Sequence, residues 1–205
     1  MANYSNIFVN EGLSYAAYRD IIDSLLEQGK TTGSDNSDAM VHYSKMNVQR
    51  MNRVDKTVIL NTSFSAAISQ LKNKYLMLVI SEGWCGDAAQ ISPVFQKMTT
   101  EYPEKFDLRF VLRDEHLPLI DAHLTNGGRA IPIVLIMDSE GELITTWGPR
   151  PVLLQHLLNE WKTEISDMFA LAEKLHLWYA RDKTQTTQNE LATVIGSLEI
   201  NLQLQ

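Results

Sequence analysis

One short apolar run constrains the fold of this chain more than any other feature. Residues 75–81 read YLMLVIS, a continuous apolar segment that ends at Glu82 and Gly83. The run is too short for a buried helix, so it predicts a central β-strand that is covered on both faces. A strand of this kind requires helices packed on either side of its sheet.

The segments after this strand alternate between helical and strand patterns. The apolar spacing predicts helices at 86–100 and 116–126, strands at 106–114, 131–138 and 143–147, and one long amphipathic helix at about 151–180. A strand–helix–strand unit gives parallel neighbours, whereas the tight turn at 138–142 adds an antiparallel strand. The order therefore predicts an α/β fold whose mixed sheet has about four strands and is flanked by helices.

Helical patterns also occupy both ends of the chain. We expect helices at 13–28, 39–54 and 63–73, a polar linker at 182–187 and a final helix at about 188–200. The predicted organisation is a helical N-terminal extension at 1–59 that packs on the core, a core domain at 60–180, and a C-terminal linker and helix at 181–205.

Composition excludes several classes of protein. The net charge is −7 and no long basic run occurs, which argues against a nucleic-acid partner. The apolar runs are too short to span a bilayer, and the first residues lack a signal-peptide pattern. A single cysteine, Cys85, cannot form an internal disulfide. We therefore expect a reducing compartment, the cytoplasm, and no membrane partner.

Cys85 lies directly after the first strand, in the stretch SEGWCGDAAQISP at 81–93. The pattern places it at the first turn of a helix, where unpaired N–H groups and the helix dipole favour the thiolate. Asp87 in the same turn would oppose the thiolate, so two effects compete. The alternative is that Cys85 is a small buried apolar residue, as free cysteines usually are.

The segment from Trp84 to Ala88, WCGDA, resembles the WCGPC site of thioredoxins, with Ala88 in place of the second cysteine. Pro93 falls where thioredoxins carry the proline of the active-site helix, and Ile131-Pro132 is similar to their cis-proline loop. The resemblance implies a thioredoxin fold, with a thioredoxin-like domain at 60–180 and extra N-terminal and C-terminal helices.

The resemblance also implies roles for individual residues. Cys85 would be the attacking, catalytic thiol, and a cis Pro132 would set the backbone of Ile131 beside the sulfur, where an extended thiol-bearing peptide could pair with it. An ordinary trans proline at the start of a strand is the alternative. The residues that would bind substrate are Trp84, Gly86, Asp87, Ile131 and Pro132.

Two departures from the thioredoxin pattern limit the thiol–disulfide reactions that this chain could carry out. Ala88 cannot resolve a mixed disulfide, and Val79 stands where thioredoxins carry a buried aspartate, although Glu82 or Asp87 could partly substitute for it. We therefore expect monothiol exchange that needs an outside thiol, either glutathione as a co-substrate or a protein partner's cysteine, and no other cofactor. The alternative is a redox-inactive binding module that holds a protein partner in the groove beside Pro132.

Other charged residues give weaker signals. Arg50 lies on the predicted helix at 39–54, where it could lower the pKa of Cys85 or bind an acidic ligand group, although such residues more often form a solvated face. His116 and His123 supply at most two ligands, so no metal site is expected. The segment WGPRP at 147–151 is interpreted as a turn and not as a ligand site.

Overall fold

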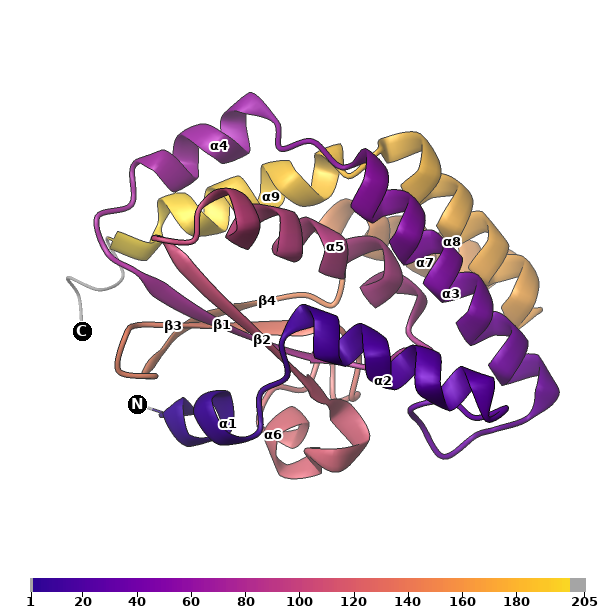
Figure 1. Cartoon of the computed structure of the whole chain (residues 1–205). Coiled ribbons are helices and arrows are strands. Elements are labelled where there is room, and N and C mark those ends of the chain that lie inside the picture. Colours follow the sequence, from indigo (N-terminus) through magenta and orange to yellow (C-terminus); the bar gives the residue numbers. More distant parts are fainter. Residues whose placement is uncertain (1, 200–205) are drawn as a thin grey trace.

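A four-stranded mixed sheet forms the centre of the computed structural model, which describes residues 2–199 (Figure 1). The strands are β1 (Tyr75–Ser81), β2 (Phe106–Leu112), β3 (Ile133–Met137) and β4 (Leu143–Trp147), in the order β2-β1-β3-β4. β1 pairs in parallel with β2 and antiparallel with β3, and β3 pairs antiparallel with β4. The predicted α/β class and mixed sheet are confirmed.

β1 is buried on both faces, which explains its continuous apolar sequence. Met77 and Val79 belong to one core cluster of apolar side chains. Leu78 and Ile80, which point to the other face of the sheet, belong to a second cluster. Because successive side chains of a strand point to opposite faces, a strand covered on both sides must be apolar at nearly every position.

Helices cover both faces of the sheet, but unequally. They are α1 (Ser5–Asn10), α2 (Tyr15–Glu27), α3 (Asp38–Thr57), α4 (Thr62–Ser69), α5 (Gly86–Glu101), α6 (Leu117–Asp121), α7 (Val152–Glu164), α8 (Met168–Asp182) and α9 (Gln185–Gly196), with a 3-10 turn η1 (Arg113–Glu115) before α6. Short helices α1 and α6 lie on one side of the sheet, and the longer helices gather on the other (Figure 1).

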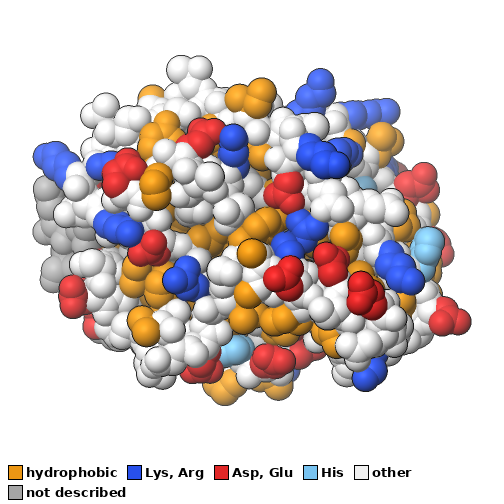
Figure 2. All heavy atoms as spheres, in the orientation of Figure 1, with side chains coloured by type: hydrophobic (Ala, Val, Ile, Leu, Met, Phe, Trp, Pro, Cys, Tyr) orange, Lys and Arg blue, Asp and Glu red, His pale blue; other side chains and the backbone are white. Residues whose placement is uncertain are grey.

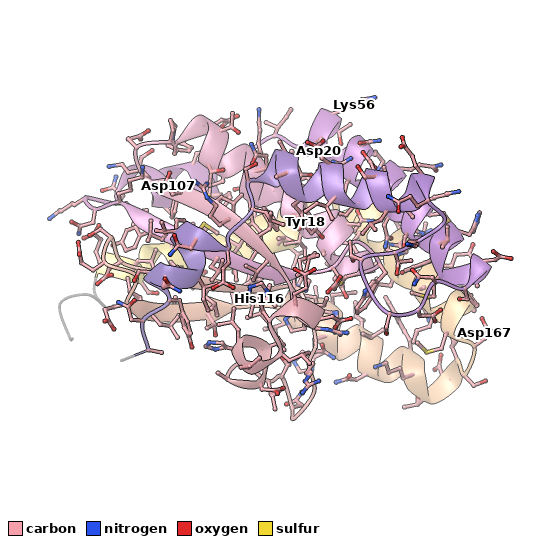
Figure 3. The ribbon with its side chains drawn as sticks, turned by 60° about the horizontal axis from the view of Figure 1, so that its bottom comes forward. Tyr18, Asp20, Lys56, Asp107, His116 and Asp167 are labelled. Atoms are coloured by element: carbon pink, nitrogen blue, oxygen red, sulfur yellow. The ribbon has the colours of Figure 1, made fainter. Side chains whose placement is uncertain are left out.

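α2 closes the edge of the larger core over β2. The ring of Tyr18 stacks on Phe110 of β2 with the ring centroids 4.8 Å apart, and its hydroxyl bonds the hydroxyl of Ser81 at 2.9 Å. Figure 3 shows Tyr18 inside the molecule beneath α2, whereas Asp20 and Asp107 lie toward the outside. The bond to Ser81 anchors the end of β1, from which the chain runs on to Cys85.

The prediction of one helix over 151–180 is wrong, because the chain breaks at residues 165–167. Ile165 is extended, and the Asp167 carboxylate accepts the N–H of Ala170 at 2.7 Å, which starts α8 as a separate helix. The apolar spacing continues through the break, so periodicity alone did not reveal it.

The polar linker expected at 182–187 is also wrong. α8 runs to Asp182, two residues with left-handed backbones (Lys183 and Thr184) follow, and α9 begins at Gln185. Gln188 is buried although it is polar, because its amide donates to the carbonyl of Ile59 and its oxygen accepts the N–H of Asn61. Two further differences are the helix α1, which was not expected, and the shortened helix α6.

Charged side chains of both signs are mixed over the face shown in Figure 2. Lys and Arg lie among Asp and Glu there, with no large field of one sign. None of the helices in the described part of the chain is both long enough and apolar enough to cross a membrane.

Replacing Gln188 with alanine should destabilise the protein by about 2–3 kcal/mol, because the backbone groups of Ile59 and Asn61 would lose their partners inside the protein. Denaturant unfolding would measure the change. Gln49→Ala is the control, since Gln49 is exposed on α3 and should shift stability by less than about 0.5 kcal/mol. An equally small change for Gln188→Ala would contradict this account of how α9 is held.

Candidate active site

Cys85 is the N-cap residue of α5, at the end of the loop that leaves β1. Its sulfur accepts the backbone N–H of Ala88 at 3.4 Å, so one of the unpaired donors of the first helical turn points at the thiol. The residue is buried, with 7% of its surface exposed. The predicted position at the start of a helix is confirmed.

Ile131 and Pro132 lie against the sulfur from the loop before β3. The Ile131–Pro132 peptide bond is cis, and the Cys85 sulfur lies 3.2 Å from the carbonyl oxygen of Ile131. A carbonyl oxygen can only accept, so the contact is an S–H donated by a protonated Cys85. The fold thus brings together two segments that are 46 residues apart in sequence.

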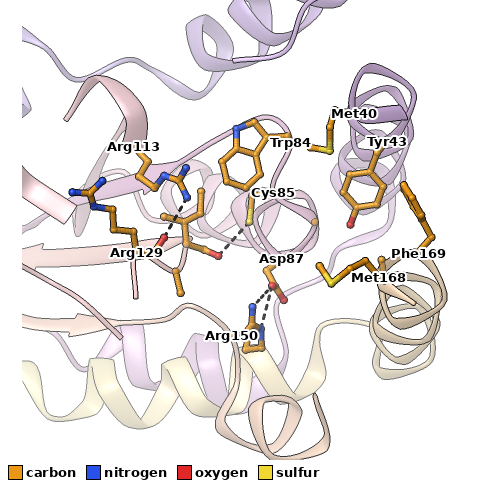
Figure 4. Close-up of a pocket in the computed structure, with 14 residues that line it drawn as sticks. Met40, Tyr43, Trp84, Cys85, Asp87, Arg113, Arg129, Arg150, Met168 and Phe169 are labelled. Carbon is orange, nitrogen blue, oxygen red and sulfur yellow. Dashed lines mark hydrogen bonds and ion pairs between the residues drawn. The ribbon is translucent and has the colours of Figure 1, made fainter. Parts of the chain in front are cut away.

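A pocket of about 430 Å³ opens beside the thiol. Figure 4 shows arginines on one side of Cys85 and methionine and aromatic side chains on the other. Four of the residues expected to bind substrate (Trp84, Gly86, Asp87 and Ile131) line the pocket, whereas Pro132 is not among the lining residues. The full lining is Met40, Tyr43, Trp84, Cys85, Gly86, Asp87, Arg113, Arg129, Ala130, Ile131, Arg150, Met168, Phe169 and Ala172.

Asp87 is held by two residues that the sequence analysis did not assign to the site. Arg150 donates to its carboxylate from Nη2 at 2.6 Å and from Nε at 3.1 Å, and the Tyr179 hydroxyl donates to it at 2.7 Å. Arg150 also lines the pocket. The segment WGPRP connects β4 to α7, as expected of a turn, but it also brings Arg150 into the pocket lining, which the sequence did not predict. Asp87 is buried, and a buried carboxylate must be paired or hydrogen-bonded, but the sequence alone does not show this burial.

The surroundings of Cys85 disfavour its thiolate. Burial, and after it the Asp87 carboxylate, raise the pKa of Cys85 to about 12, although the Ala88 N–H and Arg150 act in the opposite direction. The sequence predicted a competition between the helix start, which favours the thiolate, and Asp87, which opposes it. Desolvation decides that competition, and the position of Cys85 in the sequence does not reveal how buried the thiol is. At neutral pH the thiol carries its proton.

Gly86 allows two other helices to close over the start of α5. A Cβ atom at this position would lie 2.5 Å from the Tyr43 hydroxyl oxygen and 2.8 Å from Cε1 of His176. His176 on α8 bridges the Tyr43 hydroxyl, at 3.0 Å, and the Gln90 amide of α5, at 3.1 Å. Burial lowers the pKa of His176 to about 3, so the ring is neutral. A side chain at residue 86 would force these groups apart.

Trp84 lines the pocket, and two other segments pack against its ring. The Arg113 guanidinium lies over its ring, 4.6 Å from the centroid. Gly33 approaches the indole so closely that a Cβ atom there would lie 2.5 Å from Nε1. The loop that precedes α3 therefore takes part in fixing Trp84 beside Cys85.

Glu82 is buried and is not among the residues that line the pocket. Its carboxylate accepts the Thr32 hydroxyl and the N–H of Asp114, which ties the loop before α3 to η1. Burial raises the pKa of Glu82 to about 7. Glu82 therefore lies outside the pocket lining, near Cys85 in sequence but directed toward other loops.

Arg50 lies on α3 over the ring of Tyr43, 5.2 Å from its centroid, and donates to the Asn47 side chain. It lines the groove between α3 and α8, which adjoins the Cys85 pocket. Tyr43 thus stands between Arg50 and the thiol. Among residues 2–199, no group of three or more His, Cys, Asp or Glu side chains is arranged to hold a metal ion.

Comparison with known proteins now places the chain in a family. A family model described as thioredoxin matches residues 33–162, more than half of the chain. The chain belongs to the thioredoxin-like family. The sheet with its flanking helices is accordingly a thioredoxin fold with extra helices at both ends. The match ends before α8 and α9, although α8 contributes Met168, Phe169 and Ala172 to the pocket.

Two solved structures resemble this thioredoxin-like chain over nearly its whole length. One is an HIV epitope scaffold, with 17% identity, a TM-score of 0.59, and coverage of 100% of this chain and 99% of the scaffold. The other is a Pseudomonas aeruginosa protein of unknown function, with 16% identity, a TM-score of 0.60, and coverage of 95% and 97%. Both likenesses concern the fold alone. No curated protein sequence matches the chain.

Replacing Asp87 with asparagine should lower the pKa of Cys85, because the variant removes a nearby negative charge and leaves Arg150 free to favour the thiolate. We expect the rate of Cys85 alkylation at pH 8 to rise about tenfold, which corresponds to a shift of about one unit. The rate of alkylation against pH would measure it.

Asp107→Asn is the matched control for this substitution, since Asp107 is half-exposed on β2 and pairs with Lys74. Circular dichroism would show that both variants are folded. A Cys85 pKa that stays the same or rises in Asp87→Asn would contradict the assigned role of the carboxylate.

Glu82 should make the protein less stable as the pH rises from about 4.5 to about 7. Its pKa is higher in the folded protein than in the unfolded chain, so the folded state binds the proton more tightly, and that advantage disappears as the pH passes the folded value. The loss would reach about 3 kcal/mol. Glu82→Gln should abolish this decline in denaturant unfolding at several pH values.

Glu104→Gln is the control, since Glu104 is exposed in the loop before β2, and it should keep the decline. If Glu82→Gln showed the same pH dependence as the unsubstituted protein, the buried carboxylate would not be its source.

Proposed function

We propose that this thioredoxin-like protein carries out monothiol thiol–disulfide exchange at Cys85, with an outside thiol completing the reaction. One observation carries the proposal. The Cys85 sulfur lies in the wall of an open pocket, where it accepts the N–H of Ala88 and lies 3.2 Å from the carbonyl oxygen of Ile131. A sulfur placed between a helix start and the backbone of Ile131 can meet the sulfur of an extended peptide.

The reaction would proceed in two exchanges. The Cys85 thiolate attacks one sulfur of a substrate disulfide, the S–S bond breaks, and the departing sulfur leaves as a thiol, so that a Cys85–substrate disulfide forms. Ala88 offers no second thiol, so an external thiol such as glutathione or a partner's cysteine attacks that mixed disulfide and restores Cys85. A reducing compartment such as the cytoplasm would supply this thiol.

The raised pKa of Cys85 determines how such a reaction would depend on pH. A thiol with a pKa of about 12 is ionised to only about one part in 100,000 at pH 7. Exchange would therefore be slow in the absence of bound substrate. A substrate that displaces the S–H from the Ile131 carbonyl, or brings a positive charge toward Asp87, would favour the thiolate.

The test is the modification of Cys85 by glutathione disulfide at pH 7 to 10, followed by mass spectrometry of the intact protein. We expect one glutathione per chain, a rate that rises about tenfold for each pH unit without levelling off, and loss of the adduct on adding a reducing thiol. Cys85→Ser is the control and should remain unmodified. Absence of an adduct at every pH would exclude exchange.

The same raised pKa favours a second candidate, a redox-inactive binding module. A thiol that is buried and donates to a backbone carbonyl can act as a packing group of the pocket wall. In that case Cys85→Ser would keep the affinity for a peptide ligand, and reductant would not release the ligand. Monothiol exchange predicts the opposite on both points.

A further inference from the structure

The pocket beside Cys85 has two chemically different walls. Figure 4 shows Arg113 and Arg129 on one side of the thiol, and Met168 and Phe169 on the other. Of the charged residues in the lining, three are arginines and one is Asp87, in a chain whose net charge is −7. Each of these arginines is paired with a carboxylate of the protein, so an acidic ligand group would have to replace such a partner on an exposed guanidinium.

The basic wall can accept a carboxylate without a large cost. Arg129 pairs with Asp121, but both side chains are 45% exposed, and solvent and salt weaken an exposed ion pair of this kind. Arg113 is paired with its neighbour Asp114 and donates to the backbone oxygen of Arg129. A ligand carboxylate can therefore take the place of Asp121 on the Arg129 guanidinium.

The apolar wall of the pocket contains large side chains that are exposed to solvent. Met168 is 73% exposed and Phe169 is 59% exposed, both at the start of α8 beside the pocket. Phe169 and Ala172 also line the adjoining groove between α3 and α8. The exposed side chain of Leu177 lines the same groove and extends the apolar surface. Large exposed apolar side chains around a hollow mark a binding surface.

We propose that this pocket selects a cysteine-containing peptide segment with an acidic residue on one side of the cysteine and a large apolar residue on the other. The inference rests on the proposed exchange at Cys85 and names its substrate class. The acidic residue would lie against Arg129, the cysteine against Cys85, and the apolar residue against Phe169. Glutathione has carboxylates at both ends and no apolar side chain, so it fits only half of this pocket.

The exchange with such a peptide keeps electrons in balance. The Cys85 thiolate, having lost its proton to solvent, attacks the peptide sulfur of a peptide disulfide. The peptide's S–S bond breaks as the Cys85–peptide bond forms, and the departing thiolate takes up a proton. No other oxidant or reductant is needed.

The experiment uses short peptides whose cysteine is linked by a disulfide to 2-thiopyridine, which absorbs light when it is released. The probes carry Glu and Phe on opposite sides of the cysteine, in both orders, with Lys in place of Glu or Ser in place of Phe as comparisons, and the glutathione analogue. Each rate with the full chain, at one pH above 8, is divided by the rate with free 2-mercaptoethanol.

One order of the Glu/Phe peptide should react at least about tenfold faster than its Lys and Ser counterparts and than the glutathione probe, since each wall contributes on the order of 1.4 kcal/mol. Equal rates for all probes, or the fastest rate for glutathione, would overturn the inference and leave monothiol exchange standing. A lack of reaction with every probe would contradict the exchange itself.

Substitutions in each wall of the pocket test which wall causes which peptide preference. Arg129→Gln should remove the preference for Glu over Lys, and Phe169→Ser the preference for Phe over Ser. The matched controls Arg181→Gln and Leu153→Ser, at exposed positions outside the pocket, should keep both preferences. If either preference persists in the variant of its own wall, that wall is assigned wrongly.

Discussion

The burial of β1 on both faces is the constraint on which the rest of the structure depends. Met77 and Val79 enter one core while Leu78 and Ile80 enter the other, so neither face of this strand can tolerate a polar side chain without a partner. Helices must therefore cover both sides of the sheet. The loop to Cys85 begins where β1 ends. The site therefore lies at that end of the strand.

The buried ion pair of Asp87 and Arg150 is the second organising interaction. It connects the first turn of α5 with the loop before α7, and the Tyr179 hydroxyl adds α8 to the same carboxylate. A buried charge that loses its partner is costly, so these three segments are held together. The same carboxylate disfavours the Cys85 thiolate. The Asp87 side chain thus both holds three segments together and raises the pKa of Cys85.

α8 shows how the site extends beyond the part of the chain that matches the family. The matched residues end at 162, yet Met168 and Phe169 form a pocket wall and His176 bridges Tyr43 and Gln90. The thioredoxin fold supplies the thiol and the loop of Ile131. The added helix supplies the apolar surface beside them, and so it distinguishes this pocket from the fold that carries it.

The sequence by itself determined the α/β class, the four strands, and the position of Cys85 at a helix start, because these depend on periodicity and on local capping. It could not show the break at 165–167, since the apolar spacing runs on through it. It also could not show the burial of Gln188, whose backbone partners Ile59 and Asn61 are more than 120 residues away. Only the tertiary structure decided the protonation of Cys85 and the partner of Asp87. Desolvation and ion pairing depend on which distant segments pack around a side chain, and no local pattern records that.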